Sequence, residues 1–205
     1  MDSTDSSSNL DTTHKYLVLP FNTKDAGTFL FRPIQSADIE QIRRWRNSQK
    51  NVLRQSKDIQ PSEQELYYTR TLLPEYGKKE PNQILMSIFE SGNLLGYGGL
   101  VHISWPDRRA EISFLLDPIH EGDSDYKSII FSTFLEVVGS VAFQDLGLQK
   151  LWTETFAFRT GHLEILEKKG FSSEGRLRKH WYINGEFIDS LLHGLHLDQW
   201  RGRDR

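Results

Sequence analysis

The residue types that most often carry chemistry are sparse in this chain of 205 residues, and their spacing excludes several mechanisms. Cys is absent, which excludes a thiol nucleophile, a disulfide and a cysteine zinc site. Neither a GxxxxGK(S/T) loop nor a GxSxG turn occurs, so a P-loop nucleotidase and a hydrolase with a nucleophile elbow are disfavoured. His193 and His196 lie three residues apart in an expected strand, where they face opposite sides and make a poor metal pair.

Gly96, Gly98 and Gly99 form a glycine-rich stretch, a composition that can bind phosphates. This stretch lies within an expected strand, however, whereas phosphate-binding glycines usually stand between a strand and a helix. A bulge or a close approach of two backbones is therefore the simpler interpretation.

The overall composition is typical of a soluble globular protein. Lys and Arg number 25 against 28 Asp and Glu, a net charge of −3 that disfavours a general nucleic-acid binder. The longest apolar run, Ile129 to Phe143, is interrupted by polar residues, so no membrane span of ~18 residues is expected. The first 15 residues, MDSTDSSSNLDTTHK, lack the basic and apolar regions of a secretion signal. We expect a disordered tail over residues 1–14, a single domain over residues 15–205 and a cytoplasmic location.

The elements that must position any site alternate in a characteristic order. Periodicity and turn residues predict strands at 16–20, 28–33, 84–90, 95–105, 110–116 and 151–156, and a final hairpin of 176–183 and 186–197 around Asn184-Gly185. Helices are predicted from Ser36 with Glu40 as its capping partner, from Pro61 to Pro74, through 130–142 and over 161–169. This order predicts a mixed α/β sheet, mostly antiparallel and covered by helices.

Local strings at these positions identify a family. They are Phe31-Arg-Pro, Ile42-Arg-Arg-Trp45-Arg46-Asn47, Leu95-Gly-Tyr-Gly-Gly99, Ala110-Glu-Ile-Ser-Phe114, and Leu166-Glu-Lys-Lys-Gly170-Phe171 followed by Glu174-Gly-Arg-Leu-Arg178. Residues 29–200 resemble the GNAT superfamily of acyl-CoA-dependent N-acyltransferases, especially its ribosomal-protein alanine acetyltransferase branch. The Trp45-Arg46-Asn47 string is most similar to acetyltransferases that act on nucleotide-linked amino sugars.

The resemblance implies acetyl-CoA as co-substrate and no metal. In this fold two central strands splay apart, which places Phe114, Leu115 and Leu116 along the pantetheine arm. The basic, glycine-rich pyrophosphate loop of the family corresponds to His120–Ser128, which carries three acidic residues here. Lys127 and the amides of Tyr126–Ser128 would then hold the pyrophosphate; the alternative is a degenerate site.

The resemblance also suggests catalytic residues. Glu111 matches a family carboxylate that accepts the proton of the attacking amine, although an ion pair with Arg108 or Arg109 is the alternative. His102 on the paired strand is a second candidate base, and His162 is a third candidate that could face the thioester. Leu166 occupies the position where many members have a Tyr that protonates the leaving thiolate.

The acceptor is expected to be a small amine. Trp45 would stack on a sugar or base, Arg46 and Asn47 would contact a diphosphate and hydroxyls, and Trp105 would add an exposed aromatic face. Trp45 is equally compatible with core packing. The favoured interpretation is acetylation of a nucleotide-linked amino sugar; the alternatives are a protein N-terminus as acceptor, or a non-catalytic acyl-CoA-binding or structural domain. A homodimer is compatible with the favoured interpretation.

Overall fold

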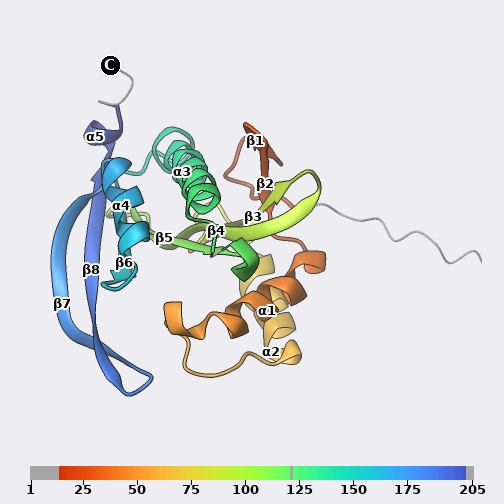
Figure 1. Cartoon of the computed structure of the whole chain (residues 1–205). Coiled ribbons are helices and arrows are strands. Elements are labelled where there is room, and N and C mark those ends of the chain that lie inside the picture. Colours follow the sequence, from red (N-terminus) through yellow and green to blue (C-terminus); the bar gives the residue numbers. More distant parts are fainter. Residues whose placement is uncertain (1–13, 121, 202–205) are drawn as a thin grey trace, which may run out of the picture.

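A single sheet of eight strands organises the chain, in the order β1-β2-β3-β4-β5-β6-β8-β7 (Figure 1). The structure is a computed structural model that describes residues 14–120 and 122–201. Neighbouring strands pair antiparallel except β5 and β6, which are parallel. The strands are β1 Lys24–Ala26, β2 Phe29–Pro33, β3 Ile84–Glu90, β4 Asn93–Ser104, β5 Arg109–Leu116, β6 Lys150–Phe156, β7 Ser172–Ile183 and β8 Glu186–His196.

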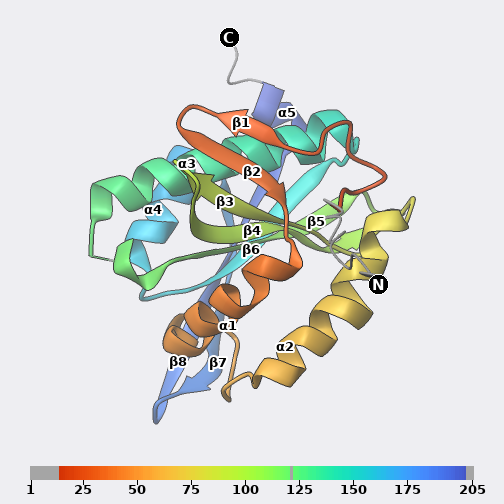
Figure 2. The same cartoon turned by 90° about the vertical axis from the view of Figure 1, so that its right-hand side faces the viewer.

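Helices cover both faces of the sheet (Figures 1 and 2). On one face lie α1 Ile39–Ser48 and α2 Pro61–Tyr67, and on the other lie α3 Ser124–Ser140 and α4 Thr160–Lys168, with α5 Leu197–Arg201 following β8. The predicted mixed sheet and the order of its major elements are confirmed. The hairpin turn is also confirmed, because Asn184 and Gly185 both have positive φ, as a type I′ turn requires.

The N-terminal expectations need three corrections. The segment 16–20 is a turn rather than a strand, and Tyr16 is fully buried with its hydroxyl accepting the Leu85 N–H at 2.8 Å. The strand that precedes β2 is β1, which pairs with it antiparallel. The helix cap lies one residue earlier than Ser36, since the Gln35 N–H donates to Asp38 Oδ2 at 2.9 Å. Of the expected tail, residues 1–13 lie outside the described residues, and His14 stacks on Tyr76 as part of the fold.

The second helix runs further than its proline suggested. After α2 the backbone continues through a wide turn at Tyr68–Leu72 and a tight turn at Leu73–Gly77. Pro74 stands at the start of that tight turn, where its missing N–H costs no hydrogen bond. The helical stretch therefore ends at Gly77 rather than at Pro74.

Helix α3 contributes many apolar side chains to the core. Residues Ser124–Asp145 are long and apolar enough to cross a membrane by composition alone, and 56% of their most apolar window is buried inside the fold. Phe131 and Phe134 pack on Phe114 of β5, with ring centroids 4.6 Å apart in each pair. This pattern is that of a core helix packed against a sheet.

The parallel pair β5–β6 opens along its length. Only Arg109–Glu111 pairs with Lys150–Trp152. Beyond that point β5 keeps its pairing with β4 as far as Leu116, and β6 keeps its pairing with β8 as far as Phe156. Each strand thus remains part of the sheet on one side while the two diverge from each other. The predicted splay of the central strands is present.

Candidate active site

The divergence of β5 and β6 leaves a cavity of about 80 Å³, which we call the gap. Its apolar wall comes from Phe114, Phe131 and Leu166, and its polar wall includes Glu111, Glu154 and Arg159. Strand edges that no neighbour pairs leave backbone groups available to an extended ligand. The gap therefore suits a narrow chain with amide groups and an apolar flank, which is the chemistry of a pantetheine arm.

His162 lies in the wall of the gap on α4. Its ring stacks on Phe131 with centroids 3.9 Å apart, and its Nδ1 is buried without a hydrogen-bond partner among the described residues. Burial lowers the pKa of His162 well below its usual value, and the charges of Arg159 and Lys127 lower it further. The imidazole is therefore neutral at physiological pH and is not available as an imidazolium acid.

Glu111 lies on β5 where the strands begin to diverge, and its side chain is 2% exposed. Oε2 is 2.7 Å from His102 Nδ1, and Oε1 accepts a hydrogen bond from Arg54 Nη2. The ion pair that the sequence suggested is present, but its expected partners are wrong, because Arg109 pairs with Asp107 at 3.5 Å. Glu111 and His102, predicted separately, form one hydrogen-bonded pair.

A bulge in β4 brings His102 to this position. The register between β4 and β5 shifts between Val101 and Ser104, and His102 has a φ of 49°, in the left-handed region that non-glycine residues seldom adopt. The imidazole is 69% exposed. Since Nδ1 faces Glu111, the carboxylate fixes the ring and leaves Nε2 directed away from it.

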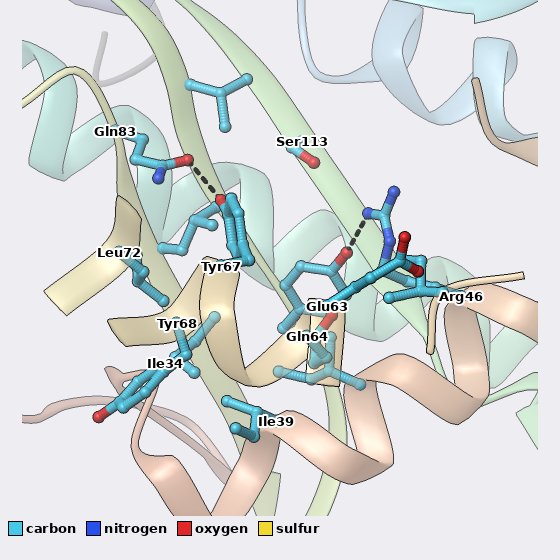
Figure 3. Close-up of a pocket in the computed structure, with 15 residues that line it drawn as sticks. Ile34, Ile39, Arg46, Glu63, Gln64, Tyr67, Tyr68, Leu72, Gln83 and Ser113 are labelled. Carbon is cyan, nitrogen blue, oxygen red and sulfur yellow. Dashed lines mark hydrogen bonds between the residues drawn. The ribbon is translucent and has the colours of Figure 1, made fainter. Parts of the chain in front are cut away.

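A second cavity lies on the opposite face of the sheet, beneath α1 and α2 (Figure 3). This helix cavity measures about 280 Å³, and its walls are mainly aliphatic and tyrosyl. It opens into a wider mouth of about 660 Å³ that is lined by Arg46, Arg54 and His102 among others. Leu53, Arg54 and Ser113 line both the mouth and the gap, so the two regions adjoin at these residues.

Arg46 is the polar group that faces the helix cavity from α1 (Figure 3). Its Nη1 donates to the Tyr97 hydroxyl at 2.7 Å and its Nε donates to Gln55 Oε1 at 3.1 Å. Tyr67 stands across the cavity, with its hydroxyl donating to Gln83 at 2.9 Å. Arg46 therefore lines a cavity, and its contact with an acceptor stays a prediction.

The other predicted acceptor residues do not face the cavity. Trp45 is 2% exposed and packs in the core, so it offers no stacking face. Asn47 binds the main chain of Ile59, donating at 2.9 Å and accepting at 2.8 Å, and thereby shapes the loop after α1. Trp105 is partly buried and donates to the Pro81 carbonyl at 2.9 Å. Trp45 and Asn47 thus do not line the cavity that α1 covers, and Trp105 lies beyond the end of β4 rather than on α1; their roles in acceptor binding stay predictions.

Of the predicted cofactor residues, some line the gap, some are buried in the core and some lie at the start of α3. Phe114 lines the gap, whereas Leu115 and Leu116 are buried in the core, where the Leu116 carbonyl accepts from Gln49 Nε2 at 2.8 Å. Tyr126, Lys127 and Ser128 lie in the first turns of α3. The Tyr126 N–H there donates to the Asp123 carboxylate at 2.9 Å, so an acidic cap holds one of the amides that a phosphate would use.

Among the charged residues of the site that were not predicted are two that pair with each other. Arg54 comes from the loop after α1, and Glu154 comes from β6, with their side chains 3.4 Å apart. Arg54 has no periodic or motif context, so only its place between two carboxylates identifies it. Among the described residues no group of three or more His, Cys, Asp or Glu side chains is arranged to hold a metal.

Comparison with known proteins agrees with this architecture. A sequence model of the acetyltransferase (GNAT) domain matches residues 31–192. YdaF of Bacillus subtilis, provisionally named a ribosomal N-acetyltransferase, is 26% identical over 137 residues, 66% of this chain and 72% of YdaF. The spermidine N(1)-acetyltransferase of Vibrio cholerae is 27% identical over 97 residues, 47% of this chain and 53% of that protein.

Solved structures give the same fold. A crystal structure of the Vibrio cholerae spermidine N-acetyltransferase in complex with CoA and spermine has a TM-score of 0.72 at 19% identity, covering 86% of this chain and 99% of that chain. Mutant forms of the same enzyme, SpeG, reach a TM-score of 0.73 at 18% identity, covering 88% and 100%. Family membership favours an enzyme over the non-catalytic alternative. The sheet, the gap between β5 and β6 and the match over residues 31–192 thus assign the chain to the GNAT family of acetyltransferases, which transfer an acetyl group from acetyl-CoA.

Proposed function

We propose that the acceptor is the primary amine of a small molecule that enters the mouth beneath α1 and α2. The observation that carries this proposal is the contact between the two regions: the gap and the mouth share Leu53, Arg54 and Ser113. An amine in the mouth and a thioester in the gap would then meet beside Glu111. The helix cavity behind the mouth, about 280 Å³ and mainly apolar, would take the body of the acceptor.

The residues of the gap fit the co-substrate. Phe114, Phe131 and Leu166 would contact the pantetheine arm, and the β5 segment Ile112–Leu116 would offer main-chain groups. Lys127 and the amides of Tyr126–Ser128 would hold the pyrophosphate, in competition with the Asp123 cap. Bound acetyl-CoA supplies a thioester carbon, which forms the new amide bond to the amine nitrogen as its bond to sulfur breaks.

Proton removal is assigned to Glu111 and His102 together. An alkylammonium must lose a proton before its nitrogen can attack a carbonyl. Glu111 is covered by Arg54 and His102, whereas the imidazole is 69% exposed in the mouth. His102 Nε2 would accept the proton, and Glu111 would orient the ring and stabilise the imidazolium that forms.

The described residues that line the gap include no phenol to protonate the departing thiolate. Leu166 is fully buried at the position where many family members have a Tyr, and the neutral His162 is not an imidazolium that could act as the acid. A CoA thiol is acidic enough to leave as thiolate and to take its proton from solvent, in line with an ordinary thiol pKa of ~8.5. This proposal therefore uses a base and no dedicated general acid.

The residues that line the cavities support some acceptor classes better than others. A nucleotide-linked amino sugar remains a candidate because Arg46 lines the cavity, but it no longer has Trp45 as a stacking partner. A polyamine is a second candidate, since carboxylates of Glu63, Glu75 and Glu154 line the helix cavity, the mouth and the gap. A protein N-terminus is the third, suggested by the ribosomal branch. The homodimer and the cytoplasmic location stay predictions.

A panel of acceptors tests the proposal. Purified protein with acetyl-CoA should acetylate small amines, among them spermidine and nucleotide-linked amino sugars, with higher kcat/KM than peptides with free N-termini. Release of CoA is the measurement, and His102→Ala is the matched inactive control. Activity confined to peptides would overturn the small-molecule acceptor and leave acetyl transfer intact.

A further inference from the structure

Two carboxylates from different strands, one buried and one partly buried, converge on one guanidinium. Glu111 on β5 is 2% exposed and Glu154 on β6 is 9% exposed. Arg54 Nη2 donates to Glu111 Oε1, and Arg54 Nη1 lies 3.4 Å from Glu154 Oε2. The pair of carboxylates straddles the point where the strands begin to diverge, so it forms an anionic site at the inner end of the gap.

Glu154 is held in its charged form. Burial by itself raises the pKa of Glu154, but the hydrogen bond from Trp181 Nε1 at 2.7 Å and the charge of Arg54 outweigh burial and lower the pKa below its usual value. Two carboxylates that both contact one guanidinium are stabilised in their charged form by that cation. In the present structure Arg54 supplies it.

The contacts around Arg54 allow its guanidinium to move away from the two carboxylates. Its side chain is 39% exposed, and it belongs to the irregular stretch between a short turn at Lys50–Val52 and α2. Other contacts hold that stretch independently, since Asn47 binds Gln55 at 3.0 Å as well as the main chain of Ile59. The guanidinium can therefore swing outward without loss of the loop.

The position of Arg54 coincides with the path of the reaction. It lines the gap and the mouth, and with Leu53 and Ser113 it separates them. The guanidinium therefore lies where the mouth, through which an amine would enter, meets the gap. An alkylammonium carries three donors and a positive charge, so it can satisfy the same carboxylates.

We propose that Arg54 is an intramolecular competitor of the acceptor: on entry, and before its proton passes to His102, the ammonium group of a cationic substrate takes the place of the Arg54 guanidinium between Glu111 and Glu154. This inference rests on the proposed entry of a small amine through the mouth. It deepens that proposal by naming the substrate class. Alkylamines that are charged at neutral pH displace Arg54, whereas neutral arylamines cannot.

Steady-state kinetics of Arg54→Met provide the first test, with 2-phenylethylamine as the charged acceptor and aniline as the neutral one. Loss of the competitor raises the fraction of protein that is open to the ammonium, so the KM for 2-phenylethylamine should fall on the order of tenfold. The KM values for aniline and acetyl-CoA should stay within about twofold. Arg44→Met, on the exposed face of α1 beside Glu40, is the matched control and should change none of them.

A binding experiment tests the same site without turnover. Arg54→Ala leaves a space shaped for a guanidinium, so ethylguanidinium should raise the Tm of this variant more than that of the wild type, where Arg54 competes with it. Arg54→Lys retains a cation and should fold with wild-type Tm, with a smaller fall in KM than Arg54→Met. The Lys variant keeps the test decisive if the neutral variants are unstable.

The outcomes separate this inference from the proposed function. A higher KM for 2-phenylethylamine in Arg54→Met, or equal effects of ethylguanidinium on Arg54→Ala and the wild type, would overturn the competitor role while acetylation of small amines stands. If the wild type acetylates no small amine, the proposed function fails. The ethylguanidinium titration then still decides whether Glu111 and Glu154 form a cation site.

Discussion

Glu111 is the residue on which the chemistry of the site depends. It is buried, yet both oxygens are hydrogen-bonded, one to the exposed His102 and one to Arg54. A buried carboxylate that loses a partner is costly, whereas one that orients an exposed imidazole supports a base in contact with solvent and substrate. Glu111 is therefore assigned as a positioning residue and His102 as the group that accepts the proton.

Substitution of each member of the pair tests this division of roles. Glu111→Gln and His102→Ala should each lower kcat by ~10²-fold with little change in the KM for acetyl-CoA, and the double variant should lose little more than either single one. The loss should shrink at high pH, where more of the amine is already neutral. Glu136→Gln, at an exposed pair with Lys169, is the control. Fully additive losses would show that Glu111 and His102 act separately.

His162 supports a second prediction at this scale, on stability. Its pKa lies well below about 6.5 because it is buried, so the unfolded chain takes up a proton before the folded one does. The free energy of unfolding should therefore fall as the pH drops below about 6.5, at up to about 1.4 kcal/mol per pH unit.

His162→Leu should remove this component of the acid sensitivity. Urea unfolding between pH 7 and pH 5 measures this component. The difference in free energy of unfolding between the wild type and the variant should grow as the pH falls. His196→Leu, at a histidine that is 51% exposed, is the matched control and should follow the wild type. Parallel curves for wild type and His162→Leu would contradict the burial argument.

The contacts of an individual residue could be predicted only where the nearby sequence determines them. Glu111 and His102 lie on adjacent strands, as predicted, but their contact depends on the bulge at His102, which the sequence did not predict. Trp45 was ambiguous because a helix offers the same residue to the core or to a cavity, and only packing decides. Arg54 could not be predicted, since its two partners lie 57 and 100 residues away in sequence.

At the scale of elements, close contact between strands explains the glycines of β4. A Cβ atom on Gly98 would lie 2.4 Å from the Ser113 carbonyl oxygen and 2.8 Å from the Phe134 ring, and a Cβ atom on Gly99 would lie 2.0 Å from the Ile84 oxygen. The interpretation as a close backbone approach is confirmed. These contacts allow α3 to lie flat on β4 and β5, which places Phe131 beside the gap.

Gly98→Ala should therefore destabilise the protein by ~2–3 kcal/mol, because neither a backbone oxygen nor a buried ring can give way. Chemical denaturation measures the loss. Gly161→Ala is the matched control: it lies in α4, where an added Cβ atom would have no described neighbour within 4 Å, and it should be neutral or stabilising by up to about 1 kcal/mol. Equal stability of Gly98→Ala and wild type would remove the steric argument.

The elements themselves were largely predictable, since long periodic segments such as α3 and β3 carry their own signal. The expected strand at 16–20 failed for a physical reason. Tyr16 and Leu19 are apolar because they fill the core beside Tyr76, and alternation over five residues does not distinguish a strand from a turn packed against the core. The splay of β5 and β6 had no local signal and came from the family resemblance alone.

At the scale of the whole molecule, charge distribution matters for the negatively charged co-substrate. The chain has a net charge of −3, and the start of α3 adds Asp123 and Asp125 where the pyrophosphate is expected. Like charges repel over about 8–10 Å at physiological salt, so local carboxylates weaken binding more than remote ones. A loop of this composition is expected to give modest affinity for acetyl-CoA rather than none, because the N-terminal turn of α3 still offers main-chain amides to the pyrophosphate.

Asp125→Asn should therefore lower the Kd for acetyl-CoA severalfold, and the Tm in the presence of acetyl-CoA should rise accordingly. Asp107→Asn changes the net charge by the same amount at the exposed β4–β5 turn, and it should leave the Kd unchanged. Asp123→Asn keeps the cap on the Tyr126 N–H and should behave like Asp125→Asn. Added salt should narrow the difference between these variants and the wild type, because it screens the repulsion that they remove. If Asp125→Asn matches Asp107→Asn, or binds acetyl-CoA more weakly than the wild type, the pyrophosphate does not lie at the start of α3.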